Sequence, residues 1–341
     1  MTGGMLSVTI AVACAALAFD FVNGFHDASN SIATIVATRV LKPWQAVLWA
    51  AFFNFAALFF FGTGVARTVG SGMVALDAVT PGVILAGLIA AIGWGLITWR
   101  FGIPTSSTHA LLGGYAGAAM THNALLHGWH AFYDPIIPAG WYMTLLFIVL
   151  APTLALVMAE ILAKVTFAAQ KKFPEKSADR FFGHMQLFSS ACLSLMHGSN
   201  DAQKTAGVIA GALVASGYTD TFAVPAWVLW LSYSVMGLGT LTGGWRIVRT
   251  LGSKLTRLRP AGGFCAESAS ALAILFATLL QLPVSTTHTT TGAIVGVGAA
   301  RSLKSVRWGL ARGIMLAWIV TIPVTAGLGG MAALVAYLCK A

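Results

Sequence analysis

Long apolar segments separated by short polar loops are the feature that most constrains the fold of this chain. Ten segments reach or approach the roughly 20 apolar residues that a helix needs to cross a bilayer. They cover residues 5–38, 44–65, 81–99, 103–121, 140–163, 185–216, 224–245, 263–281, 283–300 and 309–339. The pattern predicts an all-α polytopic membrane protein with about 10–12 transmembrane segments.

The composition excludes several other classes of protein. Only 9% of the 341 residues are charged, whereas a soluble domain typically carries about 25%. Such a chain cannot cover its surface in water, which excludes an ordinary soluble enzyme, a secreted disulfide scaffold and a disordered chain. The 20 basic and 10 acidic residues give a net charge of +10. Because the basic residues lie in short clusters between apolar runs, we expect no nucleic-acid partner.

The basic clusters predict the orientation in the membrane, since short cytoplasmic loops collect Lys and Arg. Residues 164–184, 246–262 and 301–307 contain five, five and three of them, and residues 122–139 and 217–223 contain none. Ten crossings that start outside the cell place every basic loop in the cytoplasm. We therefore expect a multi-pass protein of the cell (inner) membrane whose two halves have opposite orientations.

Two polar motifs occur once in each half, in the same order. GFHDASNS matches GSNDAQKT at an offset of 174, and PTSSTHALLG matches PVSTTHTTTG at an offset of 179. The duplication predicts two inverted membrane repeats, residues 1–163 and 185–341, joined by a basic cytoplasmic linker at 164–184. The first and sixth apolar segments are too long for one crossing, so we expect each helix to be broken at its Asp motif.

Asp27 and Asp201 are candidates for cation coupling. A carboxylate inside a membrane segment is costly and by default functional, and these two occupy equivalent positions. With backbone carbonyls freed at a helix break, each would offer oxygen ligands to a proton or to Na⁺. Capping of a helix N-terminus is the alternative, structural role.

Polar neighbours of the two aspartates are further candidates. Asn23 is assigned to the cation, and the substrate is assigned four residues: Asn30, Asn200, Gln203 and Lys204. Lys204 is either an anion contact or a salt-bridge partner of Asp201.

The two Pro-Ser/Thr loops are candidate anion sites. Proline ends the preceding helix, and hydroxyls cap the next helix, whose free N–H groups and partial positive charge favour an anion. Six hydroxyls would surround a tetrahedral oxyanion: Ser106, Ser107, Thr108, Ser285, Thr286 and Thr287. Ordinary helix capping is the alternative. Either re-entrant hairpins or interrupted crossings would leave the flanking loops on the same side.

Electrostatics links the two kinds of motif. Two ionised aspartates would repel a divalent anion in a low-dielectric site, whereas bound cations would attract it. Anion and cation should therefore bind cooperatively, which is the basis of symport. Glu267, in an apolar segment, is a further candidate for gating or for binding a proton or cation. We expect no catalytic residue, no resident cofactor and no metal site beyond Na⁺ at the two aspartates.

Four other residues are assigned structural roles. Asp20 and Glu160 are expected near helix ends. His109 and His288 are expected to hydrogen-bond the loop backbone rather than to bind a metal.

These motifs resemble those of the inorganic phosphate transporter (PiT) family, in particular its bacterial low-affinity permeases. The resemblance rests on GFHDASNSIATIVATRVL, LMHGSNDAQKTAGVIAGAL and GFCAESASALAILFATLLQLPVSTTHTTTGAIVGVG, and it covers nearly the whole chain. It implies import of inorganic phosphate by alternating access, coupled to Na⁺ or H⁺, and it favours a homodimer. In bacterial members the cargo can be a neutral complex of phosphate with a divalent metal.

Two residues depart from the family pattern. His26 stands where many relatives have Asn, which favours a proton at Asp27 and adds His26 to the cation-coupling set. Asn54 stands where animal relatives have Glu, so the cation sites need not be identical.

Three alternatives remain open at this point. A sulfate permease of the same family would use the same helix termini. A membrane-embedded phosphate-handling enzyme could use Asp and His with an activated hydroxyl. A metal permease could use outer-loop histidines, namely His122, His127 and His130.

Overall fold

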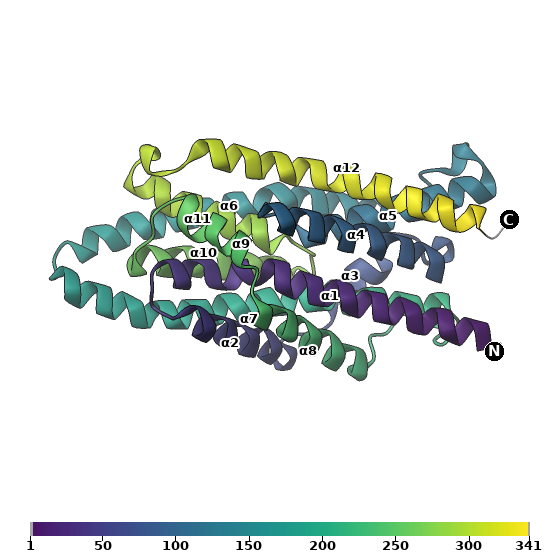
Figure 1. Cartoon of the computed structure of the whole chain (residues 1–341), viewed down its shortest axis with the longest axis horizontal. Helices are drawn as coiled ribbons and strands as arrows, with labels where there is room; N and C mark the ends of the chain where they lie inside the picture. The colour runs from purple at the N-terminus through teal and green to yellow at the C-terminus, as the bar shows by residue number, and fades with distance from the viewer. Residues whose placement is uncertain (1–2, 340–341) are drawn as a thin grey trace.

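The computed structural model describes residues 3–339, and twelve α-helices account for most of them (Figure 1). They are α1 (Gly3–Ala37), α2 (Pro43–Ala56), α3 (Gly64–Ser71), α4 (Pro81–Phe101), α5 (Ser107–His127), α6 (Pro138–Gln170), α7 (Glu175–Ala215), α8 (Ala226–Thr242), α9 (Trp245–Arg249), α10 (Pro260–Leu279), α11 (Thr286–Arg301) and α12 (Trp308–Leu338). Within residues 3–339 there is no strand, only an isolated bridge between Val74 and Ile136. The all-helical fold predicted from the apolar segments is confirmed.

Five helices are long and apolar enough to cross a membrane, namely α1, α4, α6, α10 and α12. The bent pair formed by Pro43–Phe59 and Gly64–Ser71 can count as a sixth span. The other predicted segments are helical too, but α7 and α11 carry many polar side chains and are largely buried by their neighbours. A helix that is shielded from lipid need not be apolar, so hydropathy alone undercounts the membrane helices.

The predicted breaks at the Asp motifs are wrong, because α1 and α7 run through them without interruption. The two helices have 35 and 41 residues, which at about 1.5 Å per residue makes both longer than a hydrocarbon core of about 30 Å. Polar residues on α1 recur every three or four positions and are all buried, so they lie on one inward face without a break: Asp20, Asn23, Asp27, Asn30 and Thr34. The sharp bend, of 86°, lies between α2 and α3 instead.

Each Pro-Ser/Thr loop is the tip of a helical hairpin. Residues 102–106 join α4 to α5, and residues 280–285 join α10 to α11. Backbone hydrogen bonds hold the outer ends of the first hairpin together, including Ala75 N–H to Pro135 O at 2.8 Å. The structure therefore has hairpins rather than interrupted crossings at these loops.

The two hairpins enter the molecule from opposite ends (Figure 1). Arg307 N–H donates to Leu255 O at 3.0 Å beside the outer ends of α10 and α11. The tips meet in the interior, where Thr108 Oγ1 donates to Val284 O at 3.1 Å. Together with the continuous helices α1 and α7, the opposed hairpins give the two halves the inverted arrangement that the repeated motifs predict.

Glycines let the hairpins approach their neighbours closely. A Cβ at Gly117 of α5 would lie 2.1 Å from Ala326 O of α12. A Cβ at Gly292 of α11 would lie 2.3 Å from Pro152 O of α6. Small residues allow such backbone contact between membrane helices, so these positions fix the depth of each hairpin.

The basic residues after α9 (Trp245–Arg249) and those of the other two basic loops lie toward one end of the molecule, opposite to both chain termini, whereas α9 itself lies nearer the middle (Figure 1). Much of the predicted linker is helical, because α6 continues to Gln170 and α7 begins at Glu175. Arg259 pairs with Asp179 at 2.7 Å and with Glu175, and these two carboxylates raise the pKa of its guanidinium. The clustering agrees with the predicted cytoplasmic end.

Candidate functional site

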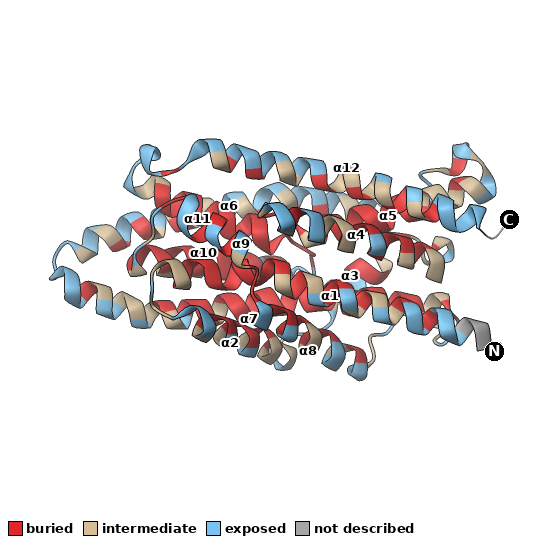
Figure 2. Cartoon of the chain, in the orientation of Figure 1, coloured by how far each residue is buried: buried red, intermediate tan, exposed pale blue. Residues whose placement is uncertain are grey.

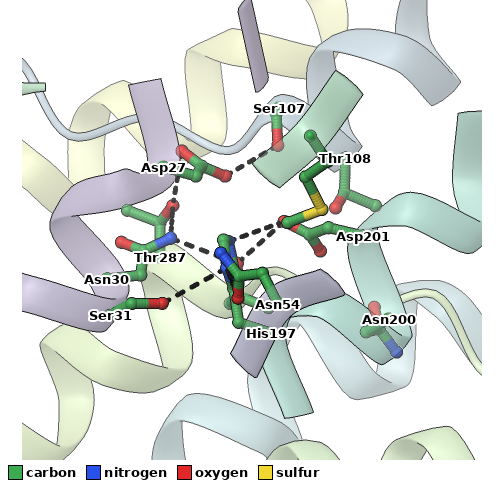
Figure 3. Close-up of polar contacts among 12 residues, drawn as sticks. Asp27, Asn30, Ser31, Asn54, Ser107, Thr108, His197, Asn200, Asp201 and Thr287 are labelled. Atoms are coloured by element: carbon green, nitrogen blue, oxygen red, sulfur yellow. Dashed lines mark hydrogen bonds and ion pairs between the residues drawn. The ribbon is translucent and has the colours of Figure 1, made fainter. Parts of the chain in front are cut away.

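The two hairpin tips, α1 and α7 enclose a buried polar site in the middle of the molecule (Figures 2 and 3). Asp27 is contributed by α1 and Asp201 by α7, and their exposed fractions are 1% and 0%. The structure thus brings together the two aspartates that the repeated motifs single out.

Asp27 is held by one donor from each hairpin. Ser107 Oγ donates to Asp27 Oδ2 at 2.8 Å, and Thr287 Oγ1 donates to Oδ1 at 3.3 Å (Figure 3). His26 Nδ1 lies 2.7 Å from the same Oδ1 atom. The carboxylate is therefore the point where α1 and both hairpins meet.

Asp201 is held by its own helix and by the second hairpin. Lys204 Nζ donates to Asp201 Oδ1 at 2.5 Å, and His197 Nε2 lies 3.2 Å from Oδ2. Thr286 Oγ1 donates to Oδ2 at 3.2 Å. The neighbouring hydroxyls Thr286 and Thr287 thus contact different aspartates, so the tip of α11 lies between the two carboxylates.

Lys204 joins Asp201 to both hairpin tips. Its Nζ also donates to Thr108 Oγ1 at 2.5 Å and to Val284 O at 2.8 Å. The sequence allowed Lys204 to be an anion contact or a salt-bridge partner of Asp201, and in the structure it forms the salt bridge. The lysine is 1% exposed, so its charge compensates that of the buried carboxylate.

His197 completes the only group of described residues with the spacing of a metal site. Its ring nitrogen and carboxylate oxygens of Asp27 and Asp201 all lie within 4.8 Å of one another. Its Nδ1 lies 3.3 Å from Ser31 Oγ and 3.2 Å from Asn54 Oδ1. His197 received no role from the sequence. Its position four residues before Asp201, on the same face of a helix, was the available signal.

The six predicted hydroxyls divide into two groups. Ser106 and Ser285 accept hydrogen bonds from the backbone N–H of His109 at 3.1 Å and of His288 at 3.2 Å, as ordinary N-caps. Three of the other four donate to an aspartate, Ser107 and Thr287 to Asp27 and Thr286 to Asp201. The fourth, Thr108, accepts from Lys204 and donates to Val284 O of the second hairpin. A ligand in the central site could replace the present partners of this second group.

Asn30 and Asn200 occupy different surroundings. Asn30 Nδ2 donates to Thr286 Oγ1 at 3.1 Å and to Thr287 Oγ1 at 3.0 Å, which places it in the central site. Asn200 instead supports the second hairpin loop, since Nδ2 donates to Leu282 O at 3.1 Å and Oδ1 accepts from Val284 N–H at 3.1 Å.

Gln203 and Asn23 lie at the margins of the site. Gln203 Oε1 accepts from the backbone N–H of Val65 at 3.1 Å and of Ala66 at 3.3 Å, at the start of α3. Asn23 is buried beside the first hairpin tip and borders a small cavity with His26. Neither amide contacts the four hydroxyls that face the aspartates.

Glu267 belongs to a separate buried cluster closer to the basic end. Its carboxylate accepts from Thr34 Oγ1 at 2.5 Å, from Ser189 Oγ at 2.6 Å and from Gln186 Nε2 at 2.9 Å. Thr34 lies two helical turns beyond Asp27 on α1. The structure therefore does not bring Glu267 into the central site.

Two structural expectations need correction. Asp20 is fully buried on the polar face of α1 rather than near a helix end. The rings of His109 and His288 lie edge to face with centroids 4.4 Å apart, and within residues 3–339 their nitrogens do not hydrogen-bond the loops. Glu160 lies on the outer surface of α6, where it pairs with Lys164 at 2.6 Å.

Comparison with known proteins finds a matching family profile and similar proteins in bacteria. The sequence profile described as "Phosphate transporter family" matches residues 23–177 and again 166–329. A protein of Rhizobium meliloti (strain 1021) named "Probable low-affinity inorganic phosphate transporter" is 49% identical over 95% of this chain and 93% of its own length. A protein of Bacillus subtilis (strain 168) with the same name is 40% identical over 96% and 97%.

A solved structure has the same fold. It is named "The sodium-dependent phosphate transporter", and it matches with a TM-score of 0.84 and 25% identity over 97% of this chain and 99% of that one. These proteins are named as transporters, which supports a transporter rather than an enzyme. None of these names supports the sulfate alternative.

Proposed function

The chain belongs to the phosphate transporter family, and from this premise we propose that it imports inorganic phosphate across the cell membrane by symport with a cation. The observation that carries the proposal is the pair of buried carboxylates at the hairpin tips. Asp27 and Asp201 come from repeat-related helices, and each carboxylate accepts a hydrogen bond from a threonine hydroxyl of the second hairpin. A movement of that hairpin would change the surroundings of both.

The phosphate site in this proposal lies at the hairpin tips. Four hydroxyls and the Asn30 amide gather there: Ser107, Thr108, Thr286 and Thr287 are the hydroxyls. The N-termini of α5 and α11 point their free N–H groups and partial positive charge at the same place. Hydroxyls that now donate to carboxylates would donate to phosphate oxygens instead.

Charge balance supports coupling to a cation. Two ionised aspartates and Lys204 leave one net negative charge in the site when the histidines are neutral, which repels an anion at low dielectric. A cation held by Asp27, His197 and Asp201, whose ligand atoms lie within 4.8 Å of one another, would remove that charge. Cation and phosphate would then bind cooperatively.

The coupling cation is proposed to be H⁺, with Na⁺ as the second candidate. His26 Nδ1 lies 2.7 Å from Asp27 Oδ1 and His197 Nε2 lies 3.2 Å from Asp201 Oδ2, so each aspartate has an imidazole beside it that could exchange a proton with it. Sodium is favoured by the name of the structural relative. Carboxylate and imidazole ligands would also accept the divalent metal of a metal–phosphate complex.

Uptake by proteoliposomes tests this proposal. Radiolabelled phosphate uptake should rise when an inward proton gradient is imposed, and unlabelled phosphate should compete while equal sulfate should not. A response to a sodium gradient alone would replace H⁺ by Na⁺. Equal competition by sulfate, or uptake that ignores both gradients, would contradict the proposal. The homodimer favoured by the family resemblance can be checked by light scattering on the purified protein in detergent, before it is reconstituted.

A further inference from the structure

A basic cavity lies at the end of the molecule toward which the basic residues of the three loops lie. It has a volume of about 310 Å³ and is bordered by the π-helical turn η4 (Thr250–Lys254), the loop after it, the end of α11 and the turn η5 (Leu303–Ser305). Five of its nine lining residues are basic: Lys254, Arg257, Arg301, Lys304 and Arg307. The other four lining residues include no acid.

The positive charge of the cavity is not compensated by the protein. None of the five basic side chains forms an ion pair with an Asp or Glu within residues 3–339. Glu175 and Asp179, in the neighbouring linker, are paired with Arg259, which does not line the cavity. Like charges gathered around one space repel one another, so an anion in that space would stabilise the loops that form it.

Tertiary hydrogen bonds fix the walls of the cavity. Thr256 Oγ1 donates to Ser305 O at 3.1 Å, and Arg307 N–H donates to Leu255 O at 3.0 Å. These bonds connect the loop before α10 with the loop after α11. The cavity is therefore formed by both outer ends of the second hairpin rather than by one mobile loop.

The chemistry of the lining favours a phosphate group. Guanidinium groups bind phosphate through paired hydrogen bonds, and Arg257 and Arg307 both border the space, with the hydroxyl of Ser253 beside them. Two apolar residues next to lining residues in the sequence are exposed: Leu303, before Lys304, is 66% exposed, and Trp308, after Arg307, is 42% exposed. Exposed Trp and basic residues together are typical of the lipid headgroup region.

We propose that this cavity binds a phosphate group at the cytoplasmic end, supplied by an anionic phospholipid headgroup or by free inorganic phosphate. The bound group would connect the two outer ends of the second hairpin. The other end of that hairpin carries Thr286 and Thr287, which contact the two aspartates. Occupancy would therefore restrict hairpin movement. The binding claim does not depend on which solute crosses the membrane.

The test compares the full chain with two variants of equal charge loss. Arg257→Gln/Lys304→Gln removes two charges from the cavity, whereas Lys171→Gln/Lys172→Gln removes two from the exposed linker outside it. Native mass spectrometry would follow binding of phosphatidylglycerol, with phosphatidylcholine as the neutral comparison. Calorimetry with inorganic phosphate would count phosphate sites on the same proteins.

A loss of phosphatidylglycerol affinity of more than about tenfold in the cavity variant alone would support the site with a lipid as its source. Loss of one phosphate site in the cavity variant alone would support free phosphate as the source. The swap Arg257→Lys/Lys304→Arg keeps the charge and should keep binding, which separates loss of the site from misfolding. Equal losses in cavity and linker variants, or no loss in either, would overturn the proposal.

Discussion

At the scale of single residues, the buried charges are compensated locally. Asp201 has Lys204 and His197 within 3.2 Å, and Glu267 accepts three hydrogen bonds. Removing Lys204 leaves the Asp201 carboxylate buried without its lysine counterion, which costs far more than losing an exposed pair. The position of each group, rather than its charge alone, decides the effect of a substitution.

Replacing Lys204 tests this difference directly. Lys204→Met removes the counterion of Asp201 and the bonds to both hairpin tips, so we expect destabilisation of about 3–5 kcal/mol and loss of uptake. Lys164→Met breaks only the exposed pair with Glu160 and should cost about 1 kcal/mol or less. Thermal unfolding of the two variants in detergent checks the prediction. Similar midpoints would contradict the compensation of Asp201 by Lys204.

Glu267 gives a second prediction at this scale. Glu267→Gln replaces one acceptor oxygen by a donor, which would face either Thr34 and Gln186 at the Oε1 position or Ser189 at the Oε2 position. An unsatisfied buried group costs about 1–3 kcal/mol, so the unfolding midpoint should fall. The matched change Glu160→Gln, on the outer surface, should leave the midpoint nearly unchanged. If both variants melt like the wild type, the cluster around Glu267 is not formed.

At the scale of helices and hairpins, sequence reasoning located the polar motifs but misjudged their backbone. It assumed that buried polar residues require a helix break. The positions 20, 23, 27, 30 and 34 already indicate one face of a continuous helix, because they follow the spacing of three and four residues. Hairpins could not be distinguished from crossings, since the distinction depends on tertiary contacts such as Thr108 to Val284.

Backbone contact between α11 and α6 gives an element-scale prediction. Gly292→Ala adds a methyl group where its Cβ would lie 2.3 Å from Pro152 O, so the second hairpin must shift outward. We expect a lower unfolding midpoint and reduced uptake, with an energetic cost of about 1–3 kcal/mol, as for overpacking. Gly313→Ala on α12, where nothing lies within 4 Å of the added Cβ, is the control and should behave as wild type.

At the scale of the whole molecule, the distribution of basic residues predicted the arrangement of the loops more reliably than hydropathy predicted the number of membrane helices. The basic residues of the three loops do lie toward one end, and the two chain termini lie at the other (Figure 1). A strict hydropathy criterion finds only five spans and leaves out α7, whose apolar character is low because other helices cover it, although the sequence analysis includes residues 185–216 among its ten segments. Likewise, sequence alone could pair Asp27 with Asp201 but could not separate Asn30, in the site, from Gln203, outside it.

Labelling from one side of the membrane tests this orientation. In a variant without its native cysteines, Lys171→Cys should react with an impermeant maleimide only from the cytoplasmic side. Tyr218→Cys, in the loop after α7, should react only from the outside. Reaction of both positions from the same side would refute the inverted threading of the two halves.

The central claim is that the two repeat-related aspartates couple phosphate import to a cation. The most direct test is radiolabelled phosphate uptake into proteoliposomes under an imposed proton or sodium gradient. The proteins compared are wild type, Asp27→Asn, Asp201→Asn and, as a control, Asp77→Asn, whose side chain is exposed away from the site. The account predicts that wild type and Asp77→Asn show gradient-driven uptake and that both other variants lose it by more than about tenfold. Gradient-driven uptake that persists in Asp27→Asn and Asp201→Asn would contradict the account.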